Sequence, residues 1–396
     1  MNIISIINLI QSILLLYLGV GVFYLFTFAV AGLFRKNHIK IKNDKMRSFA
    51  VLIPAYKEDK VILEVAEDAT KQDYPKNLYE IIVIADSLKP ETITILKAMP
   101  IKVIEVDFEK STKSKSLNKA FEILPENYDI ALILDADNIM ESSFISQLNE
   151  GLSHGFFGVQ GHRVAKNMNT PVAILDAVSE EINNHIFRRG NRALGLSSSL
   201  IGSGMAFDYK SFKSIMAGIE AIGGFDKELE LYMTQHELKV DFLEDAYVYD
   251  EKVQSFDNFS NQRRRWLSAQ FIYLKKSFGS ALIQLFTKGN IDFFNRSFQH
   301  IFLPRVLLLG LLTFFFFLSL IFDKSIFTIL WGSLFGLISL TLLLSVPAKM
   351  YNVNTLNAVL YLPKGFWLMF KALLSIKGAN TTFIHTEHGT TEKNKN

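Results

Sequence analysis

Two aspartates stand at the end of an apolar run, in the segment ALILDADNIM (131–140), with one small residue between them. Asp135 and Asp137 are hard oxygen ligands, and Mg²⁺ usually binds proteins through one or two carboxylates together with substrate phosphates. We therefore expect these two residues to hold a divalent metal, Mg²⁺ or Mn²⁺, beside a diphosphate. By itself the pattern is weak, because a buried strand that leaves the core for water can end in the same residues.

The aspartates belong to a region that alternates between two kinds of pattern. Apolar runs predict strands at 49–56, 79–86, 101–107 and 129–137, and polar stretches with helical spacing separate them at 58–71, 91–98 and 113–124. This alternation predicts an α/β domain with a mostly parallel sheet. Ligands of such sheets bind beyond the carboxyl ends of the strands, where Tyr56, Glu58 and Asp86 are expected to join Asp135 and Asp137.

Apolar residues make up 49% of the 396-residue chain and are unevenly distributed. Three segments without a charged side chain, at 1–34, 306–322 and 326–348, are long enough to cross a membrane. The segment 365–376 is too short to cross and is expected to lie in the interface. We expect an N-terminal membrane helix (1–36), a catalytic domain (45–270), interfacial helices (271–300), a transmembrane hairpin (301–348) and an interfacial helix with a tail (349–396).

Charge indicates the orientation and excludes some functions. Basic residues follow the first apolar segment, which places the middle domain in the cytoplasm of a cell with an inner, cytoplasmic membrane; they are Arg35, Lys36, Lys40, Lys42, Lys45 and Arg47. A cleaved signal peptide is the alternative for this segment, but no basic residue precedes it. The net charge of +3, without a basic patch between aromatics, argues against nucleic acid, and the absence of cysteine excludes disulfides and thiolate chemistry.

The chain resembles membrane-bound glycosyltransferases of family 2, the class that includes cellulose and hyaluronan synthases. The resemblance covers residues 51–266 and rests on VLIPAYKE, IIVIADS, KSKSLNKA, LILDADN, GSGMAF, GGFDKELEL and QRRRW. The last, at 262–266, matches the Gln-x-x-Arg-Trp motif and is the most specific. The resemblance implies a GT-A fold, which is Rossmann-like, and an inverting transfer of sugar from a nucleotide sugar, usually a UDP-sugar. The alternative for QRRRW is a basic helix attracted to anionic lipid.

The resemblance also implies roles for single residues. Around the uridine it places Ala55, Tyr56, Glu58 and Asp86. Lys113 and Asn118 match a lysine and an asparagine of a substrate-binding loop, whose glycine is replaced here by Thr112. Asp135 and Asp137 would hold the sugar nucleotide and the metal. Gly202 and Gly204 would permit close approach of the acceptor, Gln262 and Trp266 would shape its channel, and Arg265 would offset the charge of the leaving diphosphate.

An inverting transferase needs a general base, and the family's Thr-Glu-Asp motif is not intact here. In GGFDKELEL (223–231), spacing to QRRRW favours Asp226, whereas the local pattern favours Glu228. Both are also explained as solvated acids in the first turn of a helix. Asp250 and Glu251, in DFLEDAYVYDEKV (241–253), are expected to be structural, or to support the site from behind. His162 is expected at a strand edge.

The tail segment TTFIHTEHG (381–389) holds Phe383 and Thr386 at the spacing of a loop that closes over the nucleotide in the synthases. The predicted partners are a nucleotide-sugar donor, a glycan or lipid acceptor, membrane lipid and a subunit for export. The leading hypothesis is polysaccharide synthase-like extension of a glycan. Its alternatives are a single transfer to a lipid or polyprenyl phosphate, and a non-catalytic membrane scaffold built on a transferase fold.

Overall fold

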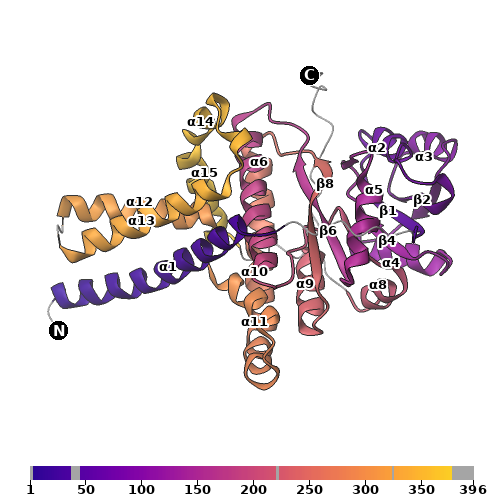
Figure 1. Ribbon diagram of the computed structural model, residues 1–396. Helices are drawn as coiled ribbons and strands as arrows, with labels where there is room; N and C mark the ends of the chain where they lie inside the picture. Colours follow the sequence, from indigo (N-terminus) through magenta and orange to yellow (C-terminus); the bar gives the residue numbers. More distant parts are fainter. Residues whose placement is uncertain (1–2, 37–44, 220–222, 323–324, 377–396) are drawn as a thin grey trace.

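The computed structural model describes residues 3–36, 45–219, 223–322 and 325–376 (Figure 1). The molecule is a mixed α/β domain joined to long apolar helices, as the sequence predicts. The sheet and its covering helices lie on one side, and α1, α12 and α13 extend together on the other, with α6 and α10 between them. Phe383 and Thr386 of the predicted gating loop lie outside the described residues.

An eight-stranded sheet has the order β3-β2-β1-β4-β7-β6-β8-β5. The pairs β1–β2, β1–β4, β2–β3 and β6–β8 are parallel, and β7 runs antiparallel to β4 and β6, as β5 does to β8. The strands are β1 (Phe49–Tyr56), β2 (Tyr79–Asp86), β3 (Lys102–Val106), β4 (Ile130–Ile133), β5 (Ile139–Met140), β6 (Gly158–Ala165), β7 (Met205–Asp208) and β8 (Val240–Asp250).

Strands β1 and β2 have the predicted bounds, but β4 ends at Ile133 rather than at residue 137. The ladder stops because the chain turns here: Leu134 still donates to the carbonyl of Leu52, and the amide of Asn138 then donates to the carbonyl of Asp135 at 3.2 Å. The two aspartates therefore lie in a tight turn beyond the strand. His162, predicted at a strand edge, lies on β6, which has β7 and β8 as neighbours and is an interior strand.

Helices cover both faces of the sheet, which explains why β1 reads as a continuous apolar run. Val51 and Ile53 pack against α2 and α5 on one face, and Ala50 and Leu52 pack with residues of α4, α8 and α9 on the other. The helices of this domain are α2 (Ile62–Ala69), α3 (Pro90–Lys97), α4 (Lys113–Ile123), α5 (Phe144–Gly151), α6 (Pro171–Asn183), α7 (Asn191–Ala193), α8 (Tyr209–Met216) and α9 (Phe225–Gln235). Two short 3₁₀ turns lie between a helix and the next strand: η1 (Lys76–Leu78) before β2 and η2 (Leu152–His154) before β6.

Three described helices are long and apolar enough to cross a membrane: α1 (Ile3–Leu33), α12 (Arg305–Phe322) and α13 (Ile326–Ser345). Their side chains form one apolar cluster that includes Val22, Leu312 and Trp331. The remaining helical segments are α10 (Phe256–Lys288), α11 (Ile291–Phe298), η4 (Gln299–Ile301), η5 (Ala348–Met350), α14 (Val353–Val359) and α15 (Leu362–Leu374). Residues 256–288 form one continuous helix that crosses the expected domain boundary at residue 270.

A π-helical segment, η3 (Asn184–Gly190), continues α6 and packs against the end of α1. The approach is close, because a Cβ on Gly190 would lie 2.3 Å from the carbonyl oxygen of Phe28. A Cβ on Gly32 would lie 2.9 Å from Nε2 of His185, which itself contacts the carbonyl of Ala29 at 2.8 Å. Arg35, just after α1, forms an ion pair with buried Asp241 of β8 at 3.2 Å. The first apolar helix is therefore fixed to the sheet domain.

Candidate active site

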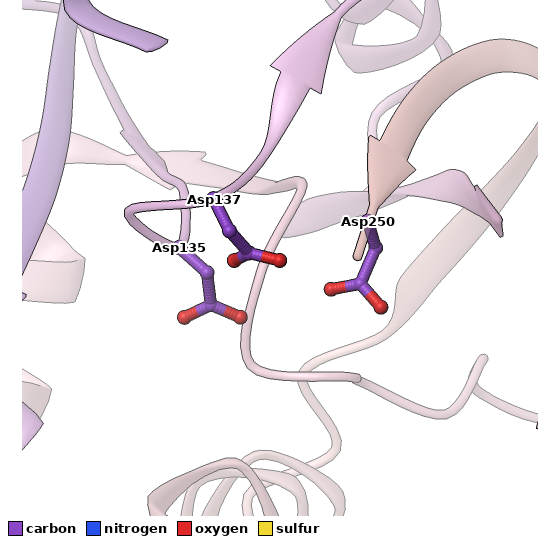
Figure 2. A group of neighbouring side chains, drawn as sticks. All are labelled: Asp135, Asp137 and Asp250. Atoms are coloured by element: carbon purple, nitrogen blue, oxygen red, sulfur yellow. The ribbon is translucent and has the colours of Figure 1, made fainter. Parts of the chain in front are cut away.

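Three aspartates meet beyond the carboxyl ends of β4 and β8 (Figure 2). One carboxylate oxygen from each of Asp135, Asp137 and Asp250 lies within 4.8 Å of the others. Backbone contacts fix them: Asp135 donates its amide to Oγ of Ser203 at 2.8 Å, and Oδ2 of Asp137 accepts the amide of Glu251 at 2.9 Å. Asp250 is the last residue of β8. The strand-end rule that singled out Asp135 and Asp137 also applies to Asp250, for which the sequence favoured a structural role.

The composition of this cluster fits a hard divalent cation. Its ligands are carboxylate oxygens, which suit Mg²⁺ and Mn²⁺, and thiolate ligands are excluded because the chain has no cysteine. The group is also open on one side, since Asp137 is buried while Asp135 is one-third exposed. Asp135, Asp137 and Asp250 would hold the ion, and the exposed side leaves room for phosphate oxygens.

Cationic side chains surround the carboxylates. Lys113 forms an ion pair with Asp135 and donates to the carbonyl of Gly202 at 2.6 Å. On the other side, Asp250 pairs with Lys252 at 2.8 Å and with Arg163 at 3.5 Å. The three aspartates are thus balanced by bases from α4, β6 and the segment after β8, and Lys113, predicted to bind substrate, is among these bases.

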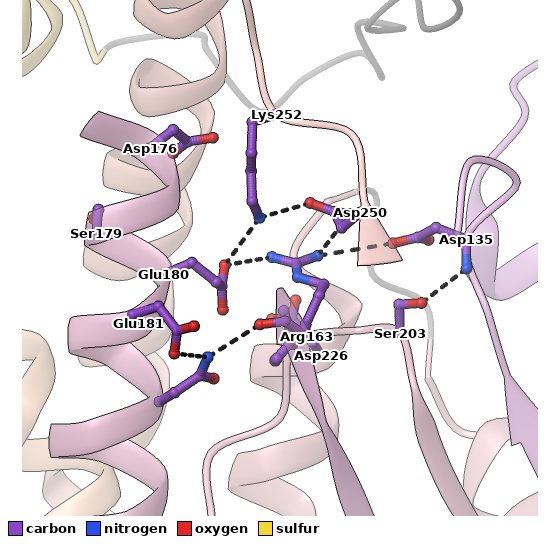
Figure 3. A network of polar contacts seen from close by, with 12 residues as sticks. Asp135, Arg163, Asp176, Ser179, Glu180, Glu181, Ser203, Asp226, Asp250 and Lys252 are labelled. Atoms are coloured by element: carbon purple, nitrogen blue, oxygen red, sulfur yellow. Dashed lines mark hydrogen bonds and ion pairs between the residues drawn. The ribbon is translucent and has the colours of Figure 1, made fainter. Parts of the chain in front are cut away.

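Arg163 links the aspartates to helix α6 (Figure 3). Its guanidinium donates to Glu180 at 2.8 Å, and Glu180 also pairs with Arg188 at 3.3 Å and Lys252 at 3.7 Å. Burial would raise the pKa of Glu180, but Arg163, Lys252 and Arg188 together hold it below its usual range. Glu180 is therefore ionised. The sequence analysis missed this network, because Arg163 and Glu180 belong to no motif and meet only in the folded chain.

Tyr56, Glu58 and Asp86 meet at the ends of β1 and β2, and all three line the cavity described below. Asp86 is buried and accepts hydrogen bonds from Ser87 at 3.0 Å and Ser111 at 3.0 Å. Burial raises the pKa of Asp86, against the lowering effect of these hydroxyls. Ser87 has a positive φ of 55°, a conformation that non-glycine residues rarely adopt and that is enriched at functional sites.

The two candidates for the general base lie in different surroundings. Asp226, in the first turn of α9, lines the cavity near Gly202, whose Cβ position would lie 3.6 Å from Cβ of Asp226. Burial raises the pKa of Asp226, while the nearby Lys227 lowers it. Glu228 forms an ion pair with Lys276 of α10 and is outside the described lining of the cavity. The geometry thus brings Asp226 to the aspartate cluster and leaves Glu228 away from it.

Gln262, Arg265 and Trp266, from the Gln-x-x-Arg-Trp match, lie near the start of α10 and line the same cavity. Burial lowers the pKa of Arg265. Trp266 is half-exposed, and the guanidinium of Arg263 lies 4.2 Å from its ring centroid. Four other predicted residues are outside the described lining: Ala55, which is in the core, Asn118 of α4, and the glycines Gly202 and Gly204. Both glycines have positive φ, 87° and 61°, which explains their residue type.

A continuous cavity of about 1350 Å³ connects these groups with the apolar helices. At one end it is lined by the aspartates and by Glu58 and Asp86. At the other end its walls come from α12 to α15, through Leu309, Leu342, Leu343, Val346, Leu356, Val359, Leu362 and Met369. The polar site and an apolar compartment between candidate membrane helices are therefore parts of the same space.

A comparison with protein families identifies this architecture. The family model described as "Glycosyltransferase like family 2" matches residues 47–269, more than half of the chain. The chain belongs to this glycosyltransferase family. It is accordingly a glycosyltransferase, and its α/β domain has the GT-A fold that the resemblance implied.

Individual relatives of this glycosyltransferase are distant. The poly(ribitol-phosphate) β-N-acetylglucosaminyltransferase TarS of Staphylococcus aureus is 27% identical over 97 residues, which are 24% of this chain and 17% of that protein. The matched part is thus less than a fifth of the curated relative. The structure of mannosyltransferase PcManGT from Pyrobaculum calidifontis, in complex with GDP-Man and Mn²⁺, has a TM-score of 0.55 at 13% identity and covers 85% of this chain and 96% of its own. This similarity supports the fold alone.

Proposed function

We propose that this glycosyltransferase is an integral membrane enzyme that transfers a sugar, with inversion, from a nucleotide diphosphate sugar to an acceptor drawn from the membrane. The observation that carries the proposal is the continuous cavity, which has carboxylates at one end and apolar side chains of α12 and α13 at the other. A soluble acceptor would have no use for the apolar compartment. A lipid, in contrast, would bury its chain there while its head reaches the aspartates.

On the donor side, Tyr56, Glu58 and Asp86 would receive the nucleoside, and the diphosphate would lie against Asp135, Asp137 and Asp250. A bound Mg²⁺ or Mn²⁺ would supply positive charge to the leaving diphosphate. A solved structure of similar fold supports this class of donor, since it contains GDP-Man with Mn²⁺. A UDP-sugar remains our prediction for this chain.

The chain's own residues would carry the remaining chemistry. Asp226 would accept the proton of the acceptor hydroxyl as that oxygen bonds to the anomeric carbon and the bond from this carbon to the diphosphate breaks. Lys113 and Arg265 would offset the negative charge that builds on the diphosphate. Trp266 offers an indole face on which a sugar ring can stack. Asp226 is preferred to Glu228 because it lines the cavity.

The cavity favours a lipid acceptor over extension of a free glycan, which was the leading sequence hypothesis. Its apolar walls suit an acyl or prenyl chain, and the three candidate membrane helices close around it. We also propose that the catalytic domain faces the cytoplasm, where nucleotide sugars are made, on the basis of the basic residues after α1. Family membership argues against the scaffold hypothesis.

The test uses the full chain in nanodiscs with a total membrane lipid extract. We would supply radiolabelled UDP- and GDP-sugars with Mn²⁺ or Mg²⁺ and measure the label that enters the organic phase. Wild type should label a lipid with one donor, and Asp137→Ala and chelation should abolish the transfer. Asp245→Asn, at an exposed position of the same strand as Asp250, is the control and should keep the activity. Label that appears only in water-soluble polymer would contradict the lipid acceptor.

A further inference from the structure

One face of α6 carries a row of contacts to cations. Asp176 and Glu180 lie four residues apart and point to the same side of the helix, and Ser179 lies on the turn between them (Figure 3). Asp176 pairs with Arg263 of α10, and Glu180 pairs with Arg163 of β6. Between them, Ser179 contacts the third base of the row, Arg305, the first residue of α12.

Arg305 differs from the other bases in the charge of its partners. Its Nη2 donates to the carbonyl oxygen and to Oγ of Ser179, both at 3.1 Å, and both acceptors are neutral. Among the described residues, no carboxylate oxygen lies within 4.0 Å of it, and its buried Nη1 has no hydrogen-bond partner. Glu180 is close enough to interact with Arg305 electrostatically, and the ring of Phe187 lies 5.9 Å from its guanidinium carbon, but neither fills the open donor position of Nη1. An added acceptor would satisfy that donor.

Further donors are orphaned in the described lining of the cavity, and so are two acceptors, Oε1 of Glu180 and Oε1 of Gln262. Nε of Arg188 and Nε of Arg263 are buried without a hydrogen-bond partner in the described part of the chain, and both side chains are more than nine-tenths buried. All three arginines, 188, 263 and 305, line the cavity. A group of guanidinium N–H donors without acceptors is complementary to an oxyanion, because arginine donates in pairs to phosphate and carboxylate oxygens.

The position of Arg305 defines what kind of molecule carries the oxyanion. Leu309, one helical turn further along α12, lines the cavity, and so do Leu342 of α13 and Val346, which directly follows that helix. An anion bound at Arg305 would therefore share one cavity with these aliphatic side chains and with the aspartate cluster. This combination fits an amphipathic molecule with a charged head and a hydrocarbon chain.

We propose that Arg305, with Arg263 and Arg188, forms a binding site for the phosphate group of the lipid acceptor, and that the lipid chain lies along Leu309, Leu342 and Val346. The proposal rests on the proposed function, because it assigns the head-group chemistry of that same acceptor. Arg305 lies outside the segment that the family model matches, which ends at residue 269, whereas Arg188 and Arg263 lie inside it. Arg305 would select lipids that carry phosphate against neutral lipids of the same chain length.

The direct test is binding of farnesyl phosphate and of farnesol to the full chain in phosphatidylcholine nanodiscs, measured by equilibrium dialysis. Wild type should bind the phosphate about tenfold more tightly than the alcohol or better, the effect of a charge-assisted hydrogen-bond pair. Arg305→Gln should remove most of this preference, while Arg305→Lys should retain part of it. Arg264→Gln, which removes a neighbouring arginine bonded to the carbonyl of Ser375, should leave it unchanged. Equal affinities for the phosphate and the alcohol in wild type would overturn the proposal.

Two further arms identify the source of the phosphate. If an equal mole fraction of phosphatidylglycerol displaces farnesyl phosphate, the site belongs to a bulk phospholipid and the acceptor assignment fails. If inorganic phosphate displaces it equally well, the hydrocarbon chain has no role and the assignment fails as well. Resistance to both supports an acceptor phosphate. Manganese-dependent binding of UDP, retained in Arg305→Gln, shows that the variant is folded.

The same variants separate this proposal from the proposed function. If sugar is transferred to a neutral lipid and Arg305→Gln does not change KM, the function holds and the phosphate site fails. If farnesyl phosphate binds through Arg305 but no donor yields a labelled lipid, the proposed function fails although the site binds an anion.

Discussion

The guanidinium of Arg163 lies 2.8 Å from a carboxylate oxygen of Glu180, so an interior strand of the sheet is ion-paired with a helix outside it. Both side chains are largely buried, and the pair lies directly behind Asp250. Buried ion pairs resist the loss of one partner, because the remaining charge is left without compensation. The position of the aspartate cluster relative to α6 thus depends on this contact.

We expect Glu180→Gln to lower the free energy of unfolding by about 3–5 kcal/mol, because it leaves Arg163 and Arg188 buried without their common carboxylate. The measurement is thermal or denaturant unfolding in detergent. Glu122→Gln, which breaks the exposed pair with Lys119, is the control and should cost no more than about 0.5 kcal/mol. Equal effects of the two substitutions would show that the network does not stabilise the fold.

Binding of metal should depend on all three aspartates. We expect Asp137→Asn and Asp250→Asn each to weaken manganese-dependent UDP binding by at least about 100-fold, since loss of even an indirect support of a metal site costs 10- to 100-fold. Asp245→Asn should have no effect. Isothermal titration with UDP, with and without chelator, measures this. Normal metal-dependent binding in Asp250→Asn would restrict the site to the Asp-x-Asp pair.

The pH dependence should report Asp226. Burial raises its pKa, Lys227 and Lys113 lower it, and Glu230 raises it; Tyr273 of α10 is also close enough to interact with it. A base acts only when deprotonated, so a raised pKa means that kcat/KM falls as the pH drops through a value above the usual aspartate range.

Substitution of the two base candidates should separate them. Asp226→Asn should reduce kcat by about 10²- to 10⁴-fold and abolish the decrease of kcat/KM at low pH. Glu228→Gln should keep this decrease at low pH and most of the activity, because Glu228 is paired with Lys276 and is outside the described lining of the cavity. A pH profile of kcat/KM for the two variants is sufficient. If Glu228→Gln instead abolished the decrease of kcat/KM at low pH, Glu228 would be the general base.

Replacement by alanine should have opposite effects at two glycines, one in the close packing of α1 against the π-helical segment and one in open space. Gly190→Ala should destabilise the protein by about 1–3 kcal/mol, because the new methyl group would overlap the backbone of Phe28. Gly279→Ala, in α10 with open space around its Cβ position, should stabilise it by about 0.5–1 kcal/mol. Melting temperatures in the same detergent compare the two, and a neutral Gly190→Ala would show that α1 can move aside.

The sequence predicted the parts of the site that follow from local patterns. Tyr56, Asp86 and Asp135 were found because they end or follow apolar runs, and parallel strands bring their carboxyl ends together. The choice between Asp226 and Glu228, two residues apart on α9, depends on which face of the helix meets the cavity, and this requires the tertiary structure. Asp250 also ends a strand, but the sequence favoured a structural role for it. Its neighbours in the site, Asp135 and Asp137, lie far away in the chain, so no local pattern linked them to it.

Arg163, Glu180 and Arg305 could not be found from the sequence, for a different reason. Each is a charged residue whose significance lies in partners 17 or more positions away along the chain. Periodicity detects faces of helices and strands, whereas long-range charge pairing leaves no local pattern. Likewise, the 33-residue length of α10 was not predicted, because its mixed polar and apolar composition resembles a catalytic segment followed by surface helices.

The contact between α1 and the π-helical segment has a consequence for how far the enzyme can reach. Gly32 and Gly190 permit close backbone approaches between α1 and the π-helical segment, and Arg35 joins the end of α1 to β8 through its ion pair with Asp241. In a bilayer, the aspartate cluster would then stand at a constant height above the hydrocarbon region. With the proposed lipid acceptor, the enzyme would glycosylate only head groups that reach this height above the membrane. Lipids whose head groups extend too far or not far enough would not be substrates.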